Sequence, residues 1–478
     1  MGTINSAFST ITKALDADQS ALNVISNNVS NANTTGYTAE QPVWQEDSTI
    51  SINGTTYGTG ASVVSVKSTS DPVLLERLDQ QQQKASSSSA RLTALDSAQA
   101  VFSVNSGSST SSSGDIGTDI TSFFDSFSSL EAAPTDQSKR EEVLSTASTL
   151  AADISGASKS LSAQQTSLNQ SVVSTVSQVN ALTKSIASLN QQIEADGGSS
   201  DLSLQDERQQ DISDLSKLIG INQVDGGNSG LQITTTSGQL LVAGSDYNTL
   251  TTGANNGMTD VFLTTTASDG TTTSTDITSD LYTGGGQLGG YLQARDQDLP
   301  TVIDQLDQLA YSVSTAVNAL NNAGTDLAGD TSNAGDIFYQ PTAVAGSAAT
   351  MAVVMTDPDH IAAASSTAGT GDNSNAVAMA NLGSSAIVDG ATPSDYYSTM
   401  LTDLGSLVSE VSTQSTAESA SVTQLQSQVS SQSSVNLNDE ASSLETLERS
   451  YQAASKVFSI INTMMASALN LGTETTVS

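Results

Sequence analysis

The sequence predicts a mainly α-helical protein, with long coiled-coil helices from both chain ends, a helical bundle, and a β-rich module inserted in the middle of the chain. Three observations support this fold class. Apolar residues repeat at heptad spacing near both ends, a similar repeat runs through residues 144–193, and the pattern after Gly220 changes to short segments rich in Thr and Gly. The 478 residues are enough for about three structural units.

The N-terminal repeat has the spacing 4-3-4-7-3-4, and its missing position is Asp18. Its members are Ile4, Phe8, Ile11, Leu15, Leu22, Ile25 and Val29. Such spacing keeps one narrow apolar stripe facing a partner helix, as in coiled coils. Several Asn residues and then Gly36 follow, so we expect the helix to end near residues 31–33.

The C-terminal repeat alternates steps of three and four residues. Its members are Leu444, Leu447, Tyr451, Ala454, Phe458, Ile461, Met465 and Ala468. We expect Asn436 or Asn438 to cap this helix and Leu471-Gly472 to close it. Two arrangements would bury the stripes: the end helices pair within one monomer, or they stay loose and become ordered when subunits stack. The periodicity is compatible with both.

Between the ends, apolar spacing predicts helices over about 72–102, 120–130, 137–196, 202–219, 287–320 and 396–429. A Ser/Gly-rich loop is expected over 103–117, and Gly197-Gly198 should end the longest helix. Residues 231–234 and 239–242 are typical of a hairpin, and 260–266 and 271–277 of further strands. The Gly/Ala/Ser/Thr-rich residues 324–396 are ambiguous and are interpreted as short strands and loops.

These elements suggest a nested organisation with three parts. We expect a terminal coiled-coil domain made of 1–33 and 436–478, and a helical bundle made of 34–221, 284–323 and 397–435. The remaining residues, 222–283 and 324–396, are expected to form a β-rich outer domain.

Charge and composition exclude several function classes. With 14 basic and 50 acidic residues, the net charge of −36 disfavours nucleic acids and anionic membrane surfaces. No apolar stretch approaches the ~18 residues of a membrane-spanning helix. The lone His360 excludes His-based triads and two-His metal sites. Gly284, Gly286 and Gly289 match a dinucleotide-binding spacing without the strand that should precede it, so we interpret them as the entry to a helix. We therefore predict no catalytic, cofactor-binding or metal-binding residues and no enzymatic activity.

The segment from Ala21 to Thr38 resembles the N-terminal motif of bacterial flagellar axial proteins, a family that includes rod, hook and hook-associated subunits. The matching residues are Ser26, Asn27, Asn28, Asn31, Asn33, Gly36 and Tyr37. Near the other end, Asn436, Leu437, Gln452 and Ala453 lie in a segment that resembles the partner motif. Three internal stretches, 204–218, 238–242 and the pair 285–296 and 324–327, resemble a hook-associated member of the family. The chain departs from the family pattern at Ala39, where the family has Arg.

The resemblance implies a structural junction adaptor that connects hook to filament, is exported by the flagellar type III apparatus without a cleaved signal, and polymerises outside the cell. It implies terminal helices that line an inner tube and make intersubunit contacts along the two stripes. The implied partners are further copies in a ring or tube, the hook protein, the third hook-associated protein, and an export chaperone on the C-terminal helix.

Three alternatives stay open at this point. The chain could be another axial subunit, such as hook protein or the third hook-associated protein. It could be a secreted enzyme carried on an axial scaffold, for which only 324–396 offers room. It could also be a coiled-coil binding module unrelated to flagella.

Overall fold

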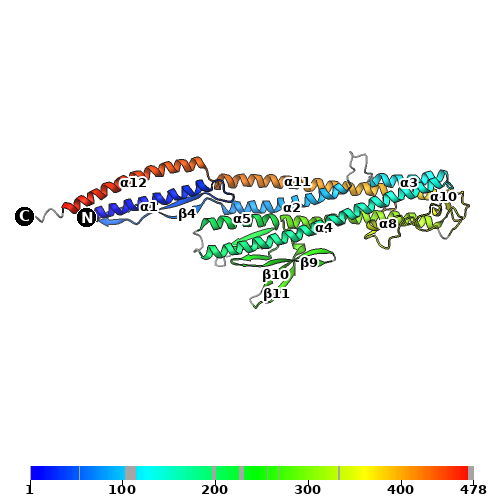
Figure 1. Ribbon diagram of the computed structural model, residues 1–478, viewed down its shortest axis with the longest axis horizontal. Coiled ribbons are helices and arrows are strands. Elements are labelled where there is room, and N and C mark those ends of the chain that lie inside the picture. The colour runs from blue at the N-terminus through cyan, green and yellow to red at the C-terminus, as the bar shows by residue number, and fades with distance from the viewer. Residues whose placement is uncertain are drawn as a thin grey trace, which may run out of the picture.

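The long helices of this protein lie roughly along one axis and give it the shape of a rod (Figure 1). The computed structural model describes residues 2–52, 54–102, 115–195, 201–225, 231–255, 257–266, 269–331 and 334–471. The predicted mainly α fold class is confirmed, with long helices from both chain ends and a sheet-containing module in the middle of the chain. Most of the predicted 103–117 loop, together with Gly197-Gly198 and Gly472, lies outside the described residues.

The helices agree closely with those expected from apolar spacing. Their bounds are α1 Gly2–Asn31, α2 Pro72–Phe102, α3 Ile116–Ala132, α4 Gln137–Ala195, α5 Leu202–Leu218, α6 Thr278–Leu281, α7 Gly286–Gln293, α8 Leu299–Ala323, α9 Ser347–Thr350, α10 Ser374–Leu382, α11 Pro393–Ser433 and α12 Leu437–Leu471. A π-helical turn over Ala294–Asp298 joins α7 to α8, and a 3₁₀ turn spans Pro358–His360. The π-helical turn was not expected from the sequence.

The strands are short, and each pairs with the strand before or after it along the chain, except that β1 pairs with β4. Their bounds are β1 Glu40–Glu46, β2 Ile50–Ile52, β3 Thr55–Tyr57, β4 Ala61–Ser68, β5 Ile221–Asp225, β6 Leu231–Thr235, β7 Leu240–Ala243, β8 Asp246–Tyr247, β9 Thr249–Asn255, β10 Met258–Thr266, β11 Thr272–Asp276, β12 Gly324–Thr325 and β13 Ala364–Ser365. The predicted hairpin is β6–β7, with Ile233 opposite Val242. The expected strands over 260–266 and 271–277 are β10 and β11.

The bundle is built from α2, α4, α5, α7, α8 and α11. The apolar positions of α2, α4, α8 and α11 meet in a common core that includes Leu95, Leu161, Leu299 and Leu404. Farther along α4, Val172, Val179 and Ile186 pack against α5 and the β-rich module. The first part of α4, from Val143 to Ala157, packs in a further core with α3 and α8. The heptad repeat of this 59-residue helix therefore serves three cores in succession, which explains why the repeat is so long.

The glycines near 284–290 allow α7 to enter the bundle at very short backbone separations. Gly285 and Gly286 adopt φ of 89° and 72°, a region that favours glycine. A Cβ on Gly220 would lie 1.6 Å from the carbonyl oxygen of Gly284. The interpretation of these glycines as a helix entry is confirmed, since α7 begins at Gly286.

Replacing Gly220 by alanine should lower the free energy of unfolding by about 1–3 kcal/mol, because the backbone of Gly284 would have to move. Urea unfolding followed by circular dichroism measures the change. The matched control is Gly405→Ala on α11, where an added Cβ meets nothing within 4 Å and alanine favours the helix. Equal stability of Gly220→Ala and the wild type would contradict the close approach.

The assignment of 324–396 to the β-rich outer domain is wrong. This segment packs on the end of the bundle formed by α3, α4 and α8, and Ile337, Phe338 and Met379 share a core with Phe123 and Phe127. Within its described residues, the only strands are the two-residue β12 and β13. Small side chains made the composition resemble a loop-rich sheet, whereas Ala362, Ala363 and Ala364 are fully buried and permit close packing of irregular backbone.

Polar side chains of the bundle satisfy the irregular backbone of 324–396. Asn318 on α8 accepts from the backbone N–H groups of Ile337 and Phe338, and Asn321 accepts from the N–H of Ala362. The buried guanidinium of Arg140 on α4 donates to the carbonyl oxygens of Pro134 and Ile361. Such bonds replace a strand ladder as the partners of buried backbone groups.

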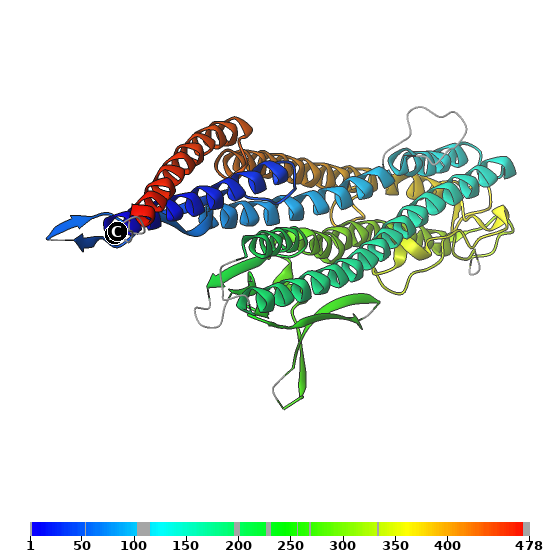
Figure 2. The ribbon, with the colours of Figure 1, turned by 60° about the vertical axis from the view of Figure 1, so that its left-hand side comes forward.

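The inclusion of all of 34–221 in the helical bundle is also wrong. Strands β1 and β4 form an antiparallel hairpin, extended by β2 and β3, that lies along α1. Figure 2 shows this hairpin reaching past the start of α1. The sequence signal was a high content of Val, Ile, Trp and Tyr over 43–66, which favours strands.

Candidate intersubunit surface

The helices from the two chain ends pack against each other within one chain. Figure 1 shows α1 and α12 side by side at one end of the rod, and the rings of Phe8 and Phe458 lie with centroids 5.0 Å apart. Helix α1 ends at Asn31, as expected. Asn436 is the capping residue of α12, since its Oδ1 accepts from the backbone N–H of Asn438 at 3.1 Å. Of the two arrangements that the periodicity allowed, this chain adopts the pairing within one monomer.

This pairing leaves both predicted stripes incompletely covered. In the N-terminal stripe Ile25 is buried, whereas Ile4, Phe8, Ile11, Leu15 and Leu22 are half-buried and Val29 is exposed. In the C-terminal stripe Leu447, Ala454, Phe458, Ile461 and Met465 are half-buried, and Leu444 and Tyr451 are exposed. None of the side chains described on α12 is buried. A 35-residue helix with this exposure is typical of a surface that another molecule covers.

Helix α12 also carries a second apolar stripe that was not predicted. Ala453, Val457, Ile460 and Met464 follow at steps of four, three and four residues, and all four are exposed. At 100° per residue this stripe lies about a third of a turn around the helix from the one that faces α1. The 4-3-4 spacing was present in the sequence, but it was obscured by the stronger repeat beside it.

Asn28 joins three elements through its side-chain amide. Its Nδ2 donates to the backbone oxygen of Glu40 and to Oε1 of Glu440, both at 2.9 Å. Its Oδ1 accepts from the backbone N–H of Glu40 at 2.9 Å and from the hydroxyl of Tyr37 at 2.8 Å. All four hydrogen-bonding positions of the amide are used, and only 1% of Asn28 is exposed. This residue therefore fixes α1, β1 and α12 relative to one another.

The other motif residues divide into two groups. Asn27 donates to the carboxylate of Glu40 at 3.4 Å, and Asn31 donates to Oδ1 of Asn27 at 2.9 Å. Gly36 adopts φ of 83° in the turn that returns the chain from α1 to β1. The second group is exposed to solvent and consists of Ser26, Asn33, Leu437, Gln452 and Ala453.

A small number of polar contacts connects the terminal helices and hairpin to the bundle. Thr38 donates from its N–H and its hydroxyl to the carboxylate of Asp206 on α5, at 2.8 and 2.7 Å. The N–H of Ala39 donates to the carbonyl oxygen of Ser433 at the end of α11, at 2.8 Å. Burial raises the pKa of Asp206 and of Glu40, and burial together with nearby carboxylates raises the pKa of Tyr37.

Asp79 on α2 lines a cavity beside these contacts and is almost fully buried. Its Oδ2 accepts from Gln209 at 3.1 Å and from Gln223 at 3.0 Å. Burial nevertheless raises the pKa of Asp79 to about 6, because these hydrogen bonds and the positive charge of Lys217 offset only part of the loss of hydration.

The free energy of unfolding should therefore depend on the protonation of Asp79. The carboxyl of Asp79 binds its proton more tightly in the folded chain than in the unfolded chain. Protonated Asp79 therefore contributes its full stabilisation of the fold below about pH 4, and this contribution is lost as the pH rises through about 6. The loss should be roughly 3 kcal/mol. Asp79→Asn should remove this dependence of stability on pH, and urea unfolding at several pH values measures it. The control is Asp96→Asn, at an exposed position of the same helix, which should leave the dependence unchanged.

The described residues contain no cluster of three or more acidic or His side chains that could hold a metal ion. No helix within the described ranges is apolar enough over a sufficient length to cross a membrane. The imidazole of His360 lies 3.1 Å from the carboxylate of Asp326. Among the described residues, these two side chains do not belong to a group of three that could bind a metal ion.

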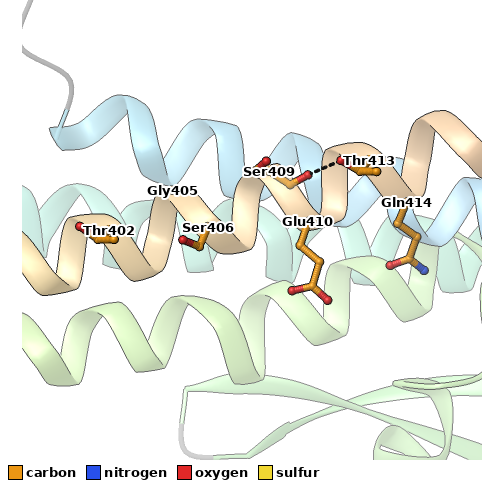
Figure 3. Close-up of a pocket in the computed structure, with 7 residues that line it drawn as sticks. All are labelled: Thr402, Gly405, Ser406, Ser409, Glu410, Thr413 and Gln414. Carbon is orange, nitrogen blue, oxygen red and sulfur yellow. Dashed lines mark hydrogen bonds between the residues drawn. The ribbon is translucent and has the colours of Figure 1, made fainter.

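The shallow surface on α11 in Figure 3 is lined mainly by short polar side chains. Its residues are Thr402, Gly405, Ser406, Ser409, Glu410, Thr413 and Gln414, and the hydroxyl of Thr413 donates to the backbone of Ser409. Such a row of small residues is compatible with solvent exposure. The surfaces around α1 and α12 are therefore the strongest candidates for function.

Two protein families have models that match parts of this chain. A family model described as "Flagellar hook-associated protein FlgK helical domain" matches residues 104–338, and one described as "Flagella basal body rod protein" matches residues 8–38. Together these matches cover more than half of the chain.

Curated relatives extend the match to nearly the whole chain, and a solved structure matches 74% of it. Flagellar hook-associated protein 1 of Escherichia coli (strain K12) is 28% identical over 98% of this chain and 99% of its own length. The protein of the same name from Bacillus subtilis (strain 168) is 24% identical over 96% and 97% of the two chains. The flagellar hook junction protein FlgK from Burkholderia pseudomallei has a similar fold, with a TM-score of 0.64 at 19% identity, covering 74% of this chain and 99% of that one.

The resemblance to flagellar axial proteins that the two end motifs predicted is thus confirmed. The matches to the N-terminal segment, to the helical region after it and to full-length relatives all concern flagellar proteins. Over nearly its whole length this chain is therefore similar to flagellar hook-associated protein 1, a structural protein of the hook–filament junction.

Proposed function

We propose that this protein connects hook to filament by polymerising through the helices at its two chain ends. The single observation that carries the proposal is α12, which has no buried side chain among those described although one whole face of it is apolar. Residues 1–33 and 436–478 would form the inner domain of the resulting ring or tube. The bundle would surround this domain, with residues 222–283 outside.

Burial of the exposed stripes supplies the driving force for this assembly. Each Leu, Ile or Phe that becomes fully buried contributes about 1.5–3 kcal/mol. Since the stripes of α1 and α12 are only half-covered within one chain, a neighbour can still gain part of that energy at each position. The net charge of −36 opposes association of free subunits and keeps them dispersed until they meet a growing end.

A strain that lacks the gene should build hooks, release flagellin into the medium and fail to swim. Complementation with Phe458→Asp should not restore swimming, because a carboxylate would replace the ring that packs on Phe8. Ser459→Asp adds the same charge at the exposed neighbouring position and should restore it. Normal filaments on the strain with Phe458→Asp would refute the proposal.

We further propose that the hook protein and the third hook-associated protein contact opposite ends of the assembled ring. Immunogold labelling of isolated hook–basal bodies tests this position. A short labelled zone at the hook tip is expected, whereas label along the whole hook would identify the chain as a hook subunit.

Before export, α12 would be covered by an export chaperone, since its apolar face is the largest uncovered one on the terminal helices. Pull-down with the full-length protein should recover the chaperone, and Phe458→Asp should abolish that recovery while Ser459→Asp retains it. Equal recovery with both variants would place the chaperone elsewhere.

A further inference from the structure

One acidic side chain of α1 lies within the N-terminal apolar stripe. Asp18 occupies the position that the heptad repeat leaves out, between Leu15 and Leu22. It is only 6% exposed, and its neighbours Ala17 and Ala21 are buried as well. Its Oδ2 is shielded from water and has no hydrogen-bond partner among the described residues. This oxygen has therefore lost its hydration without receiving a bond in return.

Asp18 differs in this respect from the other polar groups of the chain. Five further side chains in the described part of the structure have a buried oxygen or hydroxyl without a partner, but each of those residues is partly exposed as a whole. Asn28 on the same helix is also buried, and it uses all four of its hydrogen-bonding positions. Because buried polar groups are nearly always paired, the unpaired carboxylate of Asp18 requires an explanation.

Asp18 lies halfway along the contact between α1 and α12. The stacked rings of Phe8 and Phe458 mark one end of this contact. The hydrogen bond from Asn28 to Glu440 marks the other end. Asp18 is ten residues away from both Phe8 and Asn28 along α1. An unfavourable group at this place weakens the pairing in its centre, away from both end contacts.

Within the described residues, no ion pair compensates for the carboxylate of Asp18. The midpoint between Glu440 and Phe458 on α12 is Arg449, so this arginine lies at the height of Asp18. The guanidinium of Arg449 pairs instead with Glu445 on its own helix, and its side chain is 76% exposed. The cation at this height is therefore directed to solvent and leaves the buried carboxylate alone.

The closed arrangement of α1 and α12 thus carries a cost that an open arrangement avoids. When the two helices separate, water reaches the carboxylate of Asp18 and hydrates it. A buried polar group without a partner shifts such an equilibrium towards the open state by about tenfold to 100-fold. Since most members of both stripes are only half-buried in the closed state, the apolar contacts that oppose this shift are incomplete.

We propose that Asp18 limits the stability of the closed pairing of α1 with α12, so that the two helices separate and repack when subunits assemble. The proposal rests on the polymerisation proposed above and assigns its control to one residue. The free chain keeps its stripes paired, but the pairing stays weak enough to open at a growing end. Asp18→Leu would complete the heptad repeat and hold the two helices together more firmly.

Hydrogen exchange of the purified full-length chain tests the cost. Asp18→Leu and the smaller Asp18→Ala should each slow exchange of the amides in α1 and α12 by about tenfold to 100-fold, because both remove the unpaired carboxylate. The amides of α4 should exchange at the wild-type rate. The matched control is Asp16→Leu, which removes the same charge at an exposed position of the same helix and should change nothing. Unchanged or faster exchange in both Asp18 variants would refute the proposal.

Incorporation into hook–basal bodies of the deletion strain tests the consequence for assembly. Asp18→Leu should be incorporated several-fold less than the wild type and should accumulate in the medium, whereas Asp16→Leu should be incorporated normally. Slower exchange together with normal incorporation would show that opening is not needed, and would overturn this proposal while the junction role stands. Normal filaments in the strain that lacks the gene would instead refute the junction role and leave the exchange result unaffected.

Discussion

Alanine at Asn28 should loosen both terminal helices at once. The substitution removes four hydrogen bonds and leaves the hydroxyl of Tyr37, the backbone of Glu40 and the carboxylate of Glu440 without this partner. Because unpaired buried polar groups are costly, we expect the free energy of opening in this region to fall by roughly 2–4 kcal/mol. Hydrogen exchange of the amides in α1, β1 and α12 measures the change.

Asn33→Ala is the matched control, since Asn33 belongs to the same sequence motif but is exposed. It should leave the exchange rates of all three elements near those of the wild type. Equal effects of the two substitutions would mean that the motif acts through the helix end as a whole and that Asn28 has no special linking role.

Alanine at Phe338 should detach residues 324–396 from the bundle. The ring is fully buried and lies edge-on to that of Phe123, with centroids 5.4 Å apart. Truncating a buried phenylalanine costs about 3–5 kcal/mol. Limited proteolysis should then cleave within 334–382 at protease concentrations that leave the wild type intact, and thermal unfolding should begin earlier.

The neighbouring Tyr339 provides the control, because its side chain is half-exposed and lies outside the core cluster. Tyr339→Ala should change the proteolysis pattern little. Resistance of Phe338→Ala to cleavage would show that the asparagines of α8 alone hold the segment.

The long helices could be predicted from the sequence because each has a strong apolar repeat and distinct end signals. Helix α2 has the bounds expected from the sequence. Asn436, one of the two residues expected to cap α12, does cap it. Local periodicity is sufficient where a helix has a continuous apolar face, as α4 does, even though the partners of that face change along the helix.

The errors lie where packing partners come from distant parts of the chain. Residues 324–396 are held by Asn318, Asn321 and Arg140, whose roles depend on tertiary proximity and leave no local pattern. The hairpin over 40–68 depends on α1 for its cover, and the second stripe of α12 was hidden by the stronger repeat beside it. The motif residue Asn28 was identified from the family pattern, but its partner Glu440 lies 412 positions away and could not be inferred.

The narrow connection at Thr38, Ala39 and Ser433 has a mechanical consequence. The backbone passes only twice between the terminal helices and the bundle. The contacts at this connection are a few hydrogen bonds, from Thr38 to Asp206 and from Ala39 to Ser433, whereas each side has its own packed side chains. Elastic compliance of the rod is therefore concentrated at one height, where tilting breaks bonds worth about 1 kcal/mol each and leaves both cores undisturbed. We therefore expect a single subunit to bend at this connection before either core is deformed.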